Sequence, residues 1–392
     1  MEISFFLDAK LIEKEGKYYT SGAVTREYLN KHRFSDKDTL VVVTRKEKNV
    51  QLEKEMSISS DKNIKFITFN SYKEAWKKRE SIKKVVLESQ LVYTKLPASI
   101  GMIAMHYILK YDKKHIVEMV GCPYDSLNNY GSILGKILAP IMYFINRYYV
   151  KKAQNVMYVT DKFLQKRYPN KNNNIGCSDV NIENIDEIIL NKRLKKISKF
   201  NKNNTIKIGL IGSLNVNYKG HEIAFKSISK LKDKYDIELH LLGTGNKEKW
   251  SNLINKLNIK DNIYFDGTLP SGESVYKWID ELDIYIMPSL LEGLPRALVE
   301  AMSRGCPCIG TKTGGIIELL PNEMMIKKKD FKNLTQKIEK ILNNKDLMEK
   351  CAIQNFNKSK EYLKDNLAKK RNYFYNKILE EINNEKSSTC SK

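Results

Sequence analysis

Two glutamates, Glu292 and Glu300, are the side chains of this 392-residue chain whose types and spacing best suit chemistry. Glu292 stands just before a short predicted helix that contains Glu300. Pro295 suits the first turn of this helix and Gly305 suits the left-handed residue that ends it. The free N–H groups at the start of the helix form a site for an anion such as a diphosphate. A carboxylate beside that site needs hydrogen-bond donors, and sugar or ribose hydroxyls are natural ones.

A second turn, between Gly212 and Gly220, adds a positive charge and also follows a predicted strand. Its small residues, Gly212 and Ser213, allow the backbone to approach a ligand, and Lys219 brings an ammonium group to a phosphate. A departing diphosphate needs positive charge where its negative charge grows. Plainer interpretations stay open: Lys219 as one solvated lysine among many, and the two glutamates as unrelated residues of a surface helix.

Short apolar runs that alternate with helical stretches must position these side chains. This pattern is typical of parallel sheets covered by helices on both faces. The chain length is comfortable for two domains, and the polar, basic stretch 191–204 is the predicted linker between them. The first series of predicted strands is 2–8, 39–45, 64–69, 91–96, 115–121 and 155–160, and the second is 206–212, 236–243, 262–267, 283–289, 306–311 and 323–327.

Composition indicates a soluble globular protein. Hydrophobic residues make up 42% of the chain, and no apolar run is long enough to span a bilayer. The N-terminus lacks the basic residues of a signal peptide, so we expect a cytoplasmic protein. The six cysteines show no zinc-finger spacing, and we expect them to be reduced and mostly buried.

The net charge of +22 favours anionic partners. The lysines are scattered, without the arginine and aromatic stripe that reads bases, so we expect no nucleic-acid partner. Attraction to an anionic membrane surface is a hypothesis. The stretch 131–152 is apolar, aromatic and basic at its end, and it either lies in a membrane interface or, more plainly, forms a broken helix packed on its own sheet.

The residues around Glu292 resemble the signature of the retaining, nucleotide-sugar-dependent glycosyltransferases of the GT-B architecture. That signature is a Glu-x7-Glu pair followed by Gly-Gly-x-x-Glu, here Glu292, Glu300 and Gly314-Gly315-Ile-Ile-Glu318. The resemblance implies an α/β fold with two Rossmann-like domains facing across a cleft. An acceptor-binding domain would span 1–190 and a nucleotide-sugar-binding domain 205–357, with a C-terminal helix over 358–382 packing back on the first domain.

The resemblance also implies roles for individual residues. Glu300 would accept hydrogen bonds from the ribose hydroxyls. Glu292 would accept hydrogen bonds from the transferred sugar, and Lys219 would stabilise the leaving diphosphate. Glu292 and Lys219 are the residues expected to be catalytic. The remaining residues expected in donor binding are Gly212, Ser213, Gly243, Gly267, Gly293 and Leu294, together with Gly22, which lies in a turn before a predicted helix where the backbone could touch the diphosphate.

Two positions depart from the family pattern. The arginine that usually follows the first glycine of the turn is replaced by Ser213, so leaving-group charge would rest on Lys219, the helix start and Arg296. The histidine usual after the fifth strand is replaced by Gly121 and Cys122. Asp125, a little further on, either contacts the acceptor or forms a turn. Two histidines earlier in this domain, His106 and His115, are interpreted as structural.

The implied reaction is a front-side displacement in which the departing phosphate takes the acceptor's proton, without a divalent metal or other cofactor. We therefore predict a glycosyltransferase that moves a sugar from a nucleotide-sugar donor to a growing cell-surface glycan, expected to be lipid-linked, at the inner face of a membrane. The alternatives are a hydrolase or epimerase of nucleotide sugars with the same fold, and a non-catalytic partner subunit of a glycosyltransferase.

Overall fold

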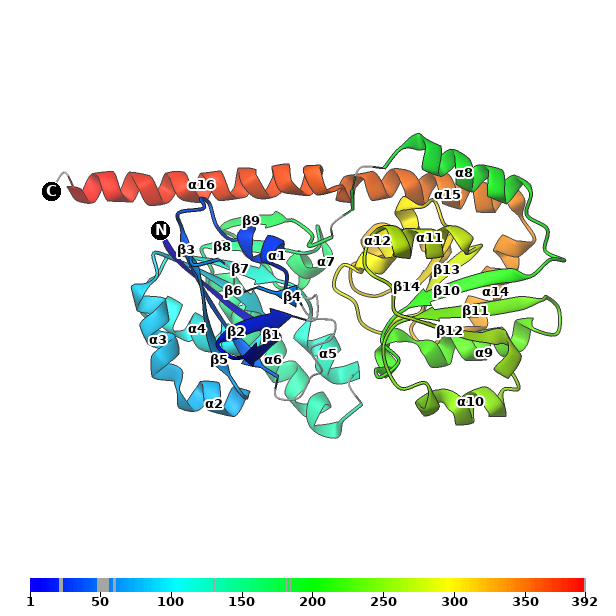
Figure 1. Ribbon diagram of the computed structural model, residues 1–392, viewed down its shortest axis with the longest axis horizontal. Helices are drawn as coiled ribbons and strands as arrows, with labels where there is room; N and C mark the ends of the chain where they lie inside the picture. Colours follow the sequence, from blue (N-terminus) through cyan, green and yellow to red (C-terminus); the bar gives the residue numbers. More distant parts are fainter. Residues whose placement is uncertain are drawn as a thin grey trace. The chain divides into compact units, whose positions relative to one another are not determined.

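The computed structural model describes residues 1–20, 24–47, 56–58, 61–129, 131–180, 182–183 and 185–390. The chain divides into two compact units, each built around its own sheet (Figure 1). The first unit comprises Met1–Tyr124 and Lys136–Gly176, and the second comprises Asp125–Gly135 and Cys177–Lys392. The C-terminal helix is grouped with the second unit, and its packing on the first domain stays a prediction.

The first unit contains a mostly parallel sheet. Its parallel strands are ordered β5-β3-β1-β6-β7-β8-β9, and the short strands β2 and β4 continue antiparallel from the far end of β1. Central strands such as β6 are buried on both faces because helices cover them, which explains their apolar sequences. The bounds are β1 Glu2–Lys14, β2 Lys17–Thr20, β3 Thr39–Lys46, β4 Met56–Ser57, β5 Ile64–Phe69, β6 Leu91–Leu96, β7 His115–Met119, β8 Asn155–Tyr158 and β9 Asn173–Gly176.

The second unit contains a six-stranded, fully parallel sheet in the order β12-β11-β10-β13-β14-β15. The chain starts at β10, builds outward to β12, and then returns to the other side of β10 with β13. The strand order therefore reverses between β10 and β13, which is where ligands bind in sheets of this kind. The bounds are β10 Ile206–Ile211, β11 Ile237–Leu242, β12 Ile263–Gly267, β13 Ile284–Met287, β14 Cys308–Thr311 and β15 Met325–Ile326.

Helices follow most strands, and in the second unit they cover both faces of the sheet (Figure 1). Several begin with a side chain that accepts from a free backbone N–H, such as Asp330 before α14 and Asn344 before α15. The bounds are α1 Arg26–Asn30, α2 Tyr72–Lys77, α3 Arg79–Glu88, α4 Ser99–Lys110, α5 Pro123–Asn129, α6 Ile133–Lys152, α7 Phe163–Arg167, α8 Glu187–Ser198, α9 His221–Leu231, α10 Ser251–Lys256, α11 Glu273–Glu281, α12 Arg296–Ser303, α13 Ile316–Leu319, α14 Phe331–Leu342, α15 Lys345–Ser359 and α16 Lys364–Cys390.

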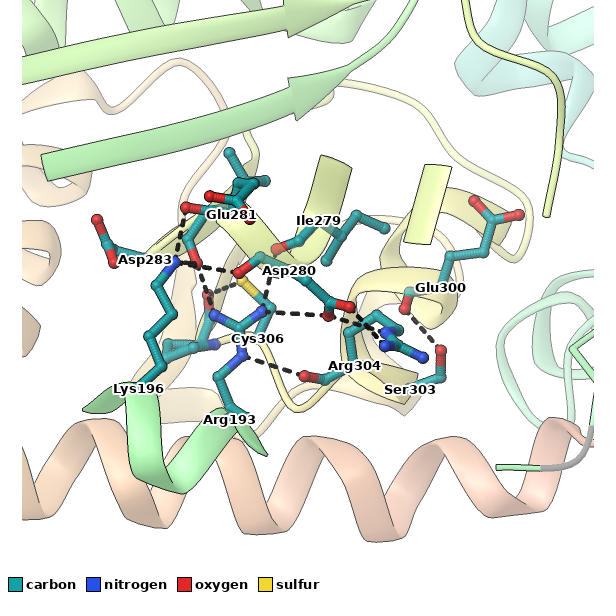
Figure 2. Close-up of polar contacts among 12 residues, drawn as sticks. Arg193, Lys196, Ile279, Asp280, Glu281, Asp283, Glu300, Ser303, Arg304 and Cys306 are labelled. Carbon is teal, nitrogen blue, oxygen red and sulfur yellow. Dashed lines mark hydrogen bonds and ion pairs between the residues drawn. The ribbon is translucent and has the colours of Figure 1, made fainter. Parts of the chain in front are cut away.

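The stretch 191–204, expected as a linker, is largely helical, because α8 extends through Ser198. Figure 2 shows the reason. The buried guanidinium of Arg193 donates to the carbonyl oxygens of Ile279, Leu282 and Arg304 at 3.0, 2.6 and 3.1 Å. The ammonium of Lys196 donates to the carbonyls that end α11 and pairs with Asp283 at 3.3 Å. Basic residues that looked solvated in the sequence therefore cap the C-terminus of a neighbouring helix.

Within the stretch 131–152, residues 133–152 form one continuous helix, α6, rather than a broken one, although Pro140 lies inside it. One side of α6 is buried through Ala139, Asn146 and Val150, while many of its large apolar side chains are exposed. Among the residues that the structure describes, no helix is long and apolar enough to cross a membrane.

Candidate functional site

The catalytic pair expected from the sequence meets in the structure. The Nζ atom of Lys219 donates to Oε1 of Glu292 at 2.8 Å, and the Glu292 side chain is only 9% exposed. The two residues are 73 positions apart in the chain. They meet because their loops follow β10 and β13, the adjacent strands at which the strand order reverses. The ion pair thus occupies the position in the sheet where a ligand is expected.

A tight turn holds Lys219 in place. Residues Asn217–Lys219 form a single 3-10 turn, and Gly220 ends it with a left-handed φ of 83°. A Cβ atom at Gly220 would lie 2.2 Å from the carbonyl oxygen of Pro288, so only glycine fits against the neighbouring loop. The amide of Leu290 also donates to the carbonyl oxygen of Tyr218 at 2.7 Å. The Lys219 turn and the Glu292 loop are therefore joined by backbone contacts as well as by the ion pair.

The glycine pair after β14, Gly314 and Gly315, packs against the backbone of the Glu292 loop. The amide of Gly315 donates to the carbonyl oxygen of Gly293 at 2.6 Å. Gly314 has a φ of +53°, and a Cβ atom there would lie 2.0 Å from the carbonyl oxygen of Glu292. The sequence Gly314-Gly315 therefore allows two backbones to approach more closely than any side chain would permit.

Replacing Gly314 with alanine is expected to destabilise the fold by about 2 to 4 kcal/mol, because it combines a left-handed φ with a clash against the Glu292 loop. The matched control is Gly121→Ala, where an added Cβ meets nothing within 4 Å. Thermal unfolding followed by circular dichroism measures both variants. Equal melting temperatures for Gly314→Ala and Gly121→Ala would contradict the tight packing described here.

The sequence analysis also placed Gly212, Gly243 and Gly267 beside the nucleotide. These glycines lie at the ends of the neighbouring strands β10, β11 and β12. The amide of Gly243 donates to the carbonyl oxygen of Gly267 at 2.7 Å, and a Cβ atom on Gly243 would lie 2.2 Å from the carbonyl oxygen of Gly212. Gly212 in turn lies against the side chain of Lys219, since its added Cβ would be 3.0 Å from Cγ of that lysine. Ser213 accepts a hydrogen bond from the amide of Asn215 at 3.4 Å. The structure thus brings Gly267, Gly243, Gly212 and Lys219 into one chain of contacts.

Glu300 lies in the second turn of α12, and burial raises the pKa of its carboxyl group, while Arg296 one turn earlier opposes the shift. Figure 2 shows its carboxylate directed away from the side chain of Arg304 and the Arg193 cluster. Burial also raises the pKa of Tyr285 in β13, and both Glu292 and Glu300 add to that shift. The two carboxylates therefore lie within electrostatic reach of the same tyrosine.

Two residues near the Lys219 turn were not selected from the sequence. The Nζ atom of Lys249 donates to the carbonyl oxygen of Asn215 at 2.9 Å, which brings a second cation to the turn. His221, the first residue of α9, is fully buried beside Trp250, and burial lowers its pKa to about 4, so it is neutral at physiological pH. The loop around Lys249 has no motif, so only the fold reveals its position.

The remaining residues predicted from the sequence give less information about the site. Gly22 lies outside the residues that the structure describes. Asp125 is mostly buried in the first turn of α5 and lies 4.0 Å from Nζ of Lys328. His115 is buried: its Nδ1 donates to the carbonyl oxygen of Lys113 at 2.7 Å and its Nε2 accepts from the amide of Gln154 at 3.2 Å, as in a structural histidine. His106 lies on α4, where it lines a pocket described below.

One buried polar pair in the first unit was missed. Nε2 of His32 lies 2.8 Å from Oε1 of Glu118, and Nζ of Lys95 lies 3.6 Å from the other carboxylate oxygen. His32 also stacks on Phe5 with ring centroids 4.0 Å apart. These residues are far apart in sequence, so spacing carries no signal for them. The Glu118 carboxylate thus has both of these partners within the first unit, and the contacts stabilise the ends of β6 and β7.

The cysteines agree with the sequence analysis where they are described. Cys122, Cys177, Cys306, Cys308 and Cys351 are buried and carry thiols. Within the described part of the chain, no group of three or more histidine, cysteine, aspartate or glutamate side chains is placed to hold a metal ion.

Comparison with known proteins gives a consistent picture. Residues 191–358 match the family model described as glycosyl transferases group 1. The chain is 32% identical to Protein CapJ of Staphylococcus aureus over 383 residues, which cover 95% of this chain and 94% of that protein. A putative colanic acid biosynthesis glycosyltransferase, WcaL of Escherichia coli, is 30% identical over 131 residues, or 31% of this chain and 32% of WcaL.

Solved structures share the fold. HepE of Anabaena in complex with UDP-glucose superposes with a TM-score of 0.65 at 12% sequence identity, covering 98% of this chain and all of that one (100%). The expected α/β class and GT-B architecture, with two Rossmann-like sheets, are confirmed. At this identity the likeness concerns the fold alone.

Proposed function

This chain belongs to the glycosyl transferases group 1 family, and on that premise we propose that it moves a sugar from a nucleotide-sugar donor to a growing glycan with retention of configuration. The observation that carries the proposal is the 2.8 Å contact between Lys219 and Glu292 at the point where the strand order of the second sheet reverses. A cation, a carboxylate and the start of α12 meet there, and these are the groups that a sugar diphosphate requires.

Each group has a distinct task in this proposal. Lys219 and the backbone amides of Gly293 and Leu294 bind the diphosphate, and Glu292 accepts hydrogen bonds from hydroxyls of the transferred sugar. Glu300 accepts from the ribose hydroxyls. The ion pair holds the buried Glu292 carboxylate in a fixed orientation. When the diphosphate binds, Lys219 divides its hydrogen bonds between the phosphate and Glu292.

The missing arginine at Ser213 leaves the diphosphate's charge to other groups. Lys219 and the dipole of α12 supply part of the compensation, and Arg296, exposed at the first turn of α12, supplies another. Lys249 adds a cation near the same turn through its contact with Asn215. Leaving-group stabilisation of this kind is commonly the largest contribution that an enzyme makes to such a reaction.

The proposed chemical step conserves the anomeric configuration. The bond between the anomeric carbon and the phosphate oxygen breaks, and the acceptor oxygen bonds to the same face of that carbon. The acceptor's proton passes to the departing phosphate oxygen, so no protein nucleophile is needed. The protein supplies position and charge, and the step calls for no divalent metal.

The acceptor is proposed to be a growing, lipid-linked cell-surface polysaccharide. The proposal that the acceptor is a polysaccharide is supported by the name of WcaL, a putative colanic acid biosynthesis glycosyltransferase. The net charge of +22 supports action beside an anionic membrane at its inner face. Asp125 remains a candidate contact for the acceptor.

A panel of donors tests the proposal. We expect incubation of the full chain with UDP-sugars and GDP-sugars, together with cell-envelope extracts as acceptor, to release one nucleoside diphosphate in an acceptor-dependent manner. Release without acceptor would indicate a hydrolase, and an altered sugar without release an epimerase. Binding of a donor without turnover in the presence of every extract would indicate a non-catalytic partner, and each of these results contradicts the proposal.

A further inference from the structure

A pocket lies in the first unit, among helices α2, α4 and α6. Its volume of about 410 Å³ is within the range of ~300 to 1,000 Å³ that is typical of small-molecule sites. The pocket is lined mainly by aliphatic and aromatic side chains, and Arg79 is a cationic side chain among them. The apolar lining includes Trp76, Met102, Ile103, Tyr107, Ile145 and Tyr149.

The α6 wall of this pocket continues into an exposed apolar surface. Ile145 lines the pocket and is also one of a row of large exposed side chains along α6. Phe144, beside it, is 66% exposed, although a phenylalanine on a folded surface is usually covered. We call this row the α6 stripe, and its members are Ile137, Leu138, Ile141, Phe144, Ile145 and Tyr148.

The charges on α4 and α6 favour an anionic partner. Neither α4 nor α6 contains an aspartate or a glutamate, whereas α6 carries Lys136, Arg147, Lys151 and Lys152. At the pocket, the guanidinium of Arg79 lies 5.5 Å from the centre of the Trp76 ring. Trp76 itself is 60% exposed. Aromatic rings and cations around an apolar surface are typical of proteins that lie in the headgroup region of a bilayer.

We propose that this face binds membrane lipid: the α6 stripe enters the interface of an anionic bilayer, and the pocket among α2, α4 and α6 receives a lipid hydrocarbon chain. Arg79, which lines the pocket, pairs with the lipid phosphate. The inference deepens the proposed function, because it gives the membrane-side contact of an enzyme whose acceptor is lipid-linked. It requires no contact with the donor site.

Two other occupants fit the observations less well. A second copy of the chain would bring the cations of two α6 helices together without any acid on that helix to neutralise them. A sugar would meet hydrogen-bonding groups such as those of Tyr72, Ser99 and His106, but most of the surface that lines the pocket is apolar, which suits a hydrocarbon chain better. An anionic lipid satisfies both the apolar lining and the excess of positive charge.

Vesicle sedimentation tests the α6 stripe. We expect the full chain to bind vesicles of phosphatidylglycerol and phosphatidylcholine at low salt, and Ile137→Ser with Phe144→Ser to weaken the partition coefficient by at least about tenfold. The matched control is Ile188→Ser with Ile353→Ser, which changes two exposed isoleucines of α8 and α15. Circular dichroism confirms that both double variants are folded. Equal binding by the two double variants, or no binding by the natural chain, overturns the proposal.

Fluorescence tests the pocket. The chain has three tryptophans, and the other two, Trp250 and Trp278, lie in the second unit. The emission of Trp76 is the part of the fluorescence that the variant Trp76→Phe lacks. Vesicles whose acyl chains carry bromine are expected to quench this emission, because bromine quenches only on contact. Vesicle binding without this quenching overturns the assignment of the pocket to a hydrocarbon chain.

The remaining outcomes are also decisive. Sedimentation velocity that shows a dimer in the natural chain and a monomer in Ile137→Ser with Phe144→Ser, without vesicle binding, assigns the α6 stripe to a second copy and overturns the proposal. The vesicle measurements contain no nucleotide sugar. Failure of lipid binding is therefore distinguishable from failure of the proposed transfer reaction, which is measured with the donor panel.

Discussion

Glu292→Gln is expected to lower the turnover of sugar transfer by about a hundredfold, since a hydrogen bond to a charged group contributes ~1.5 to 3 kcal/mol and Glu292 is proposed to make more than one. The affinity for the nucleoside diphosphate is expected to be maintained or to increase. The reason is that the substitution releases the Lys219 ammonium from its 2.8 Å ion pair and leaves it free for the phosphates. Initial rates of nucleoside diphosphate release and calorimetric titration with that diphosphate measure the two effects.

The matched control for this variant is Glu222→Gln. Glu222 lies in the first turn of α9, three residues after Lys219, and pairs with Lys226 on the exposed surface of the helix. The charge change is the same, but the carboxylate faces solvent. Undiminished transfer by Glu292→Gln, or an equal loss in Glu222→Gln, contradicts the role given to Glu292.

Lys219→Met is expected to reduce turnover by about a hundredfold to a thousandfold, comparable to the loss of one preorganised charge-stabilising group in other enzymes. In contrast to Glu292→Gln, it should also weaken binding of the nucleoside diphosphate, because the ammonium contacts the phosphates in both the bound and the reacting state. It leaves the Glu292 carboxylate, only 9% exposed, without its cation. We therefore also expect a lower melting temperature.

Lys226→Met is the control for this variant, because Lys226 belongs to an exposed ion pair on α9 that contributes little to stability. The double variant Lys219→Met with Glu292→Gln completes a double-mutant cycle for this ion pair. Its melting temperature should exceed that of Lys219→Met alone, since the buried charge has been removed. A melting temperature at or below that of the single variant contradicts the account of this ion pair.

Much of the fold was predictable because buried parallel strands have a simple sequence pattern. The bounds of β5 and β6 agree with the apolar runs 64–69 and 91–96. The strand β9 was missed because Asn173–Gly176 is polar and lies at the edge of the sheet, where one side has no neighbouring strand. The short strands β2 and β4 were missed because they pair antiparallel, away from the doubly buried pattern.

The segment 191–204 shows how composition misleads. Its lysines and its one arginine predicted a solvated linker, yet that arginine, Arg193, is buried because backbone carbonyls at the end of α11 accept its hydrogen bonds. Those carbonyls come from residues more than 80 positions later in the chain. No local pattern shows that a cation will find such partners.

The candidate site was predictable to the extent that its motifs are local. The turn that ends in Lys219, the Glu292 loop and the Gly314-Gly315 pair each have a sequence signal, and the structure joins them. Their distances were not predictable, because they depend on which strands are neighbours. Lys249 and the pair of His32 and Glu118 have no motif, and only the folded chain identifies them.

The central claim is that the loops after β10 and β13 hold the diphosphate of an activated sugar. A crystal structure of the full chain with the nucleoside diphosphate that the donor panel releases tests it most directly. We predict density for the diphosphate within hydrogen-bonding distance of Nζ of Lys219 and of the amides of Gly293 or Leu294. A nucleotide bound elsewhere, with the ion pair between Lys219 and Glu292 untouched, would contradict the claim.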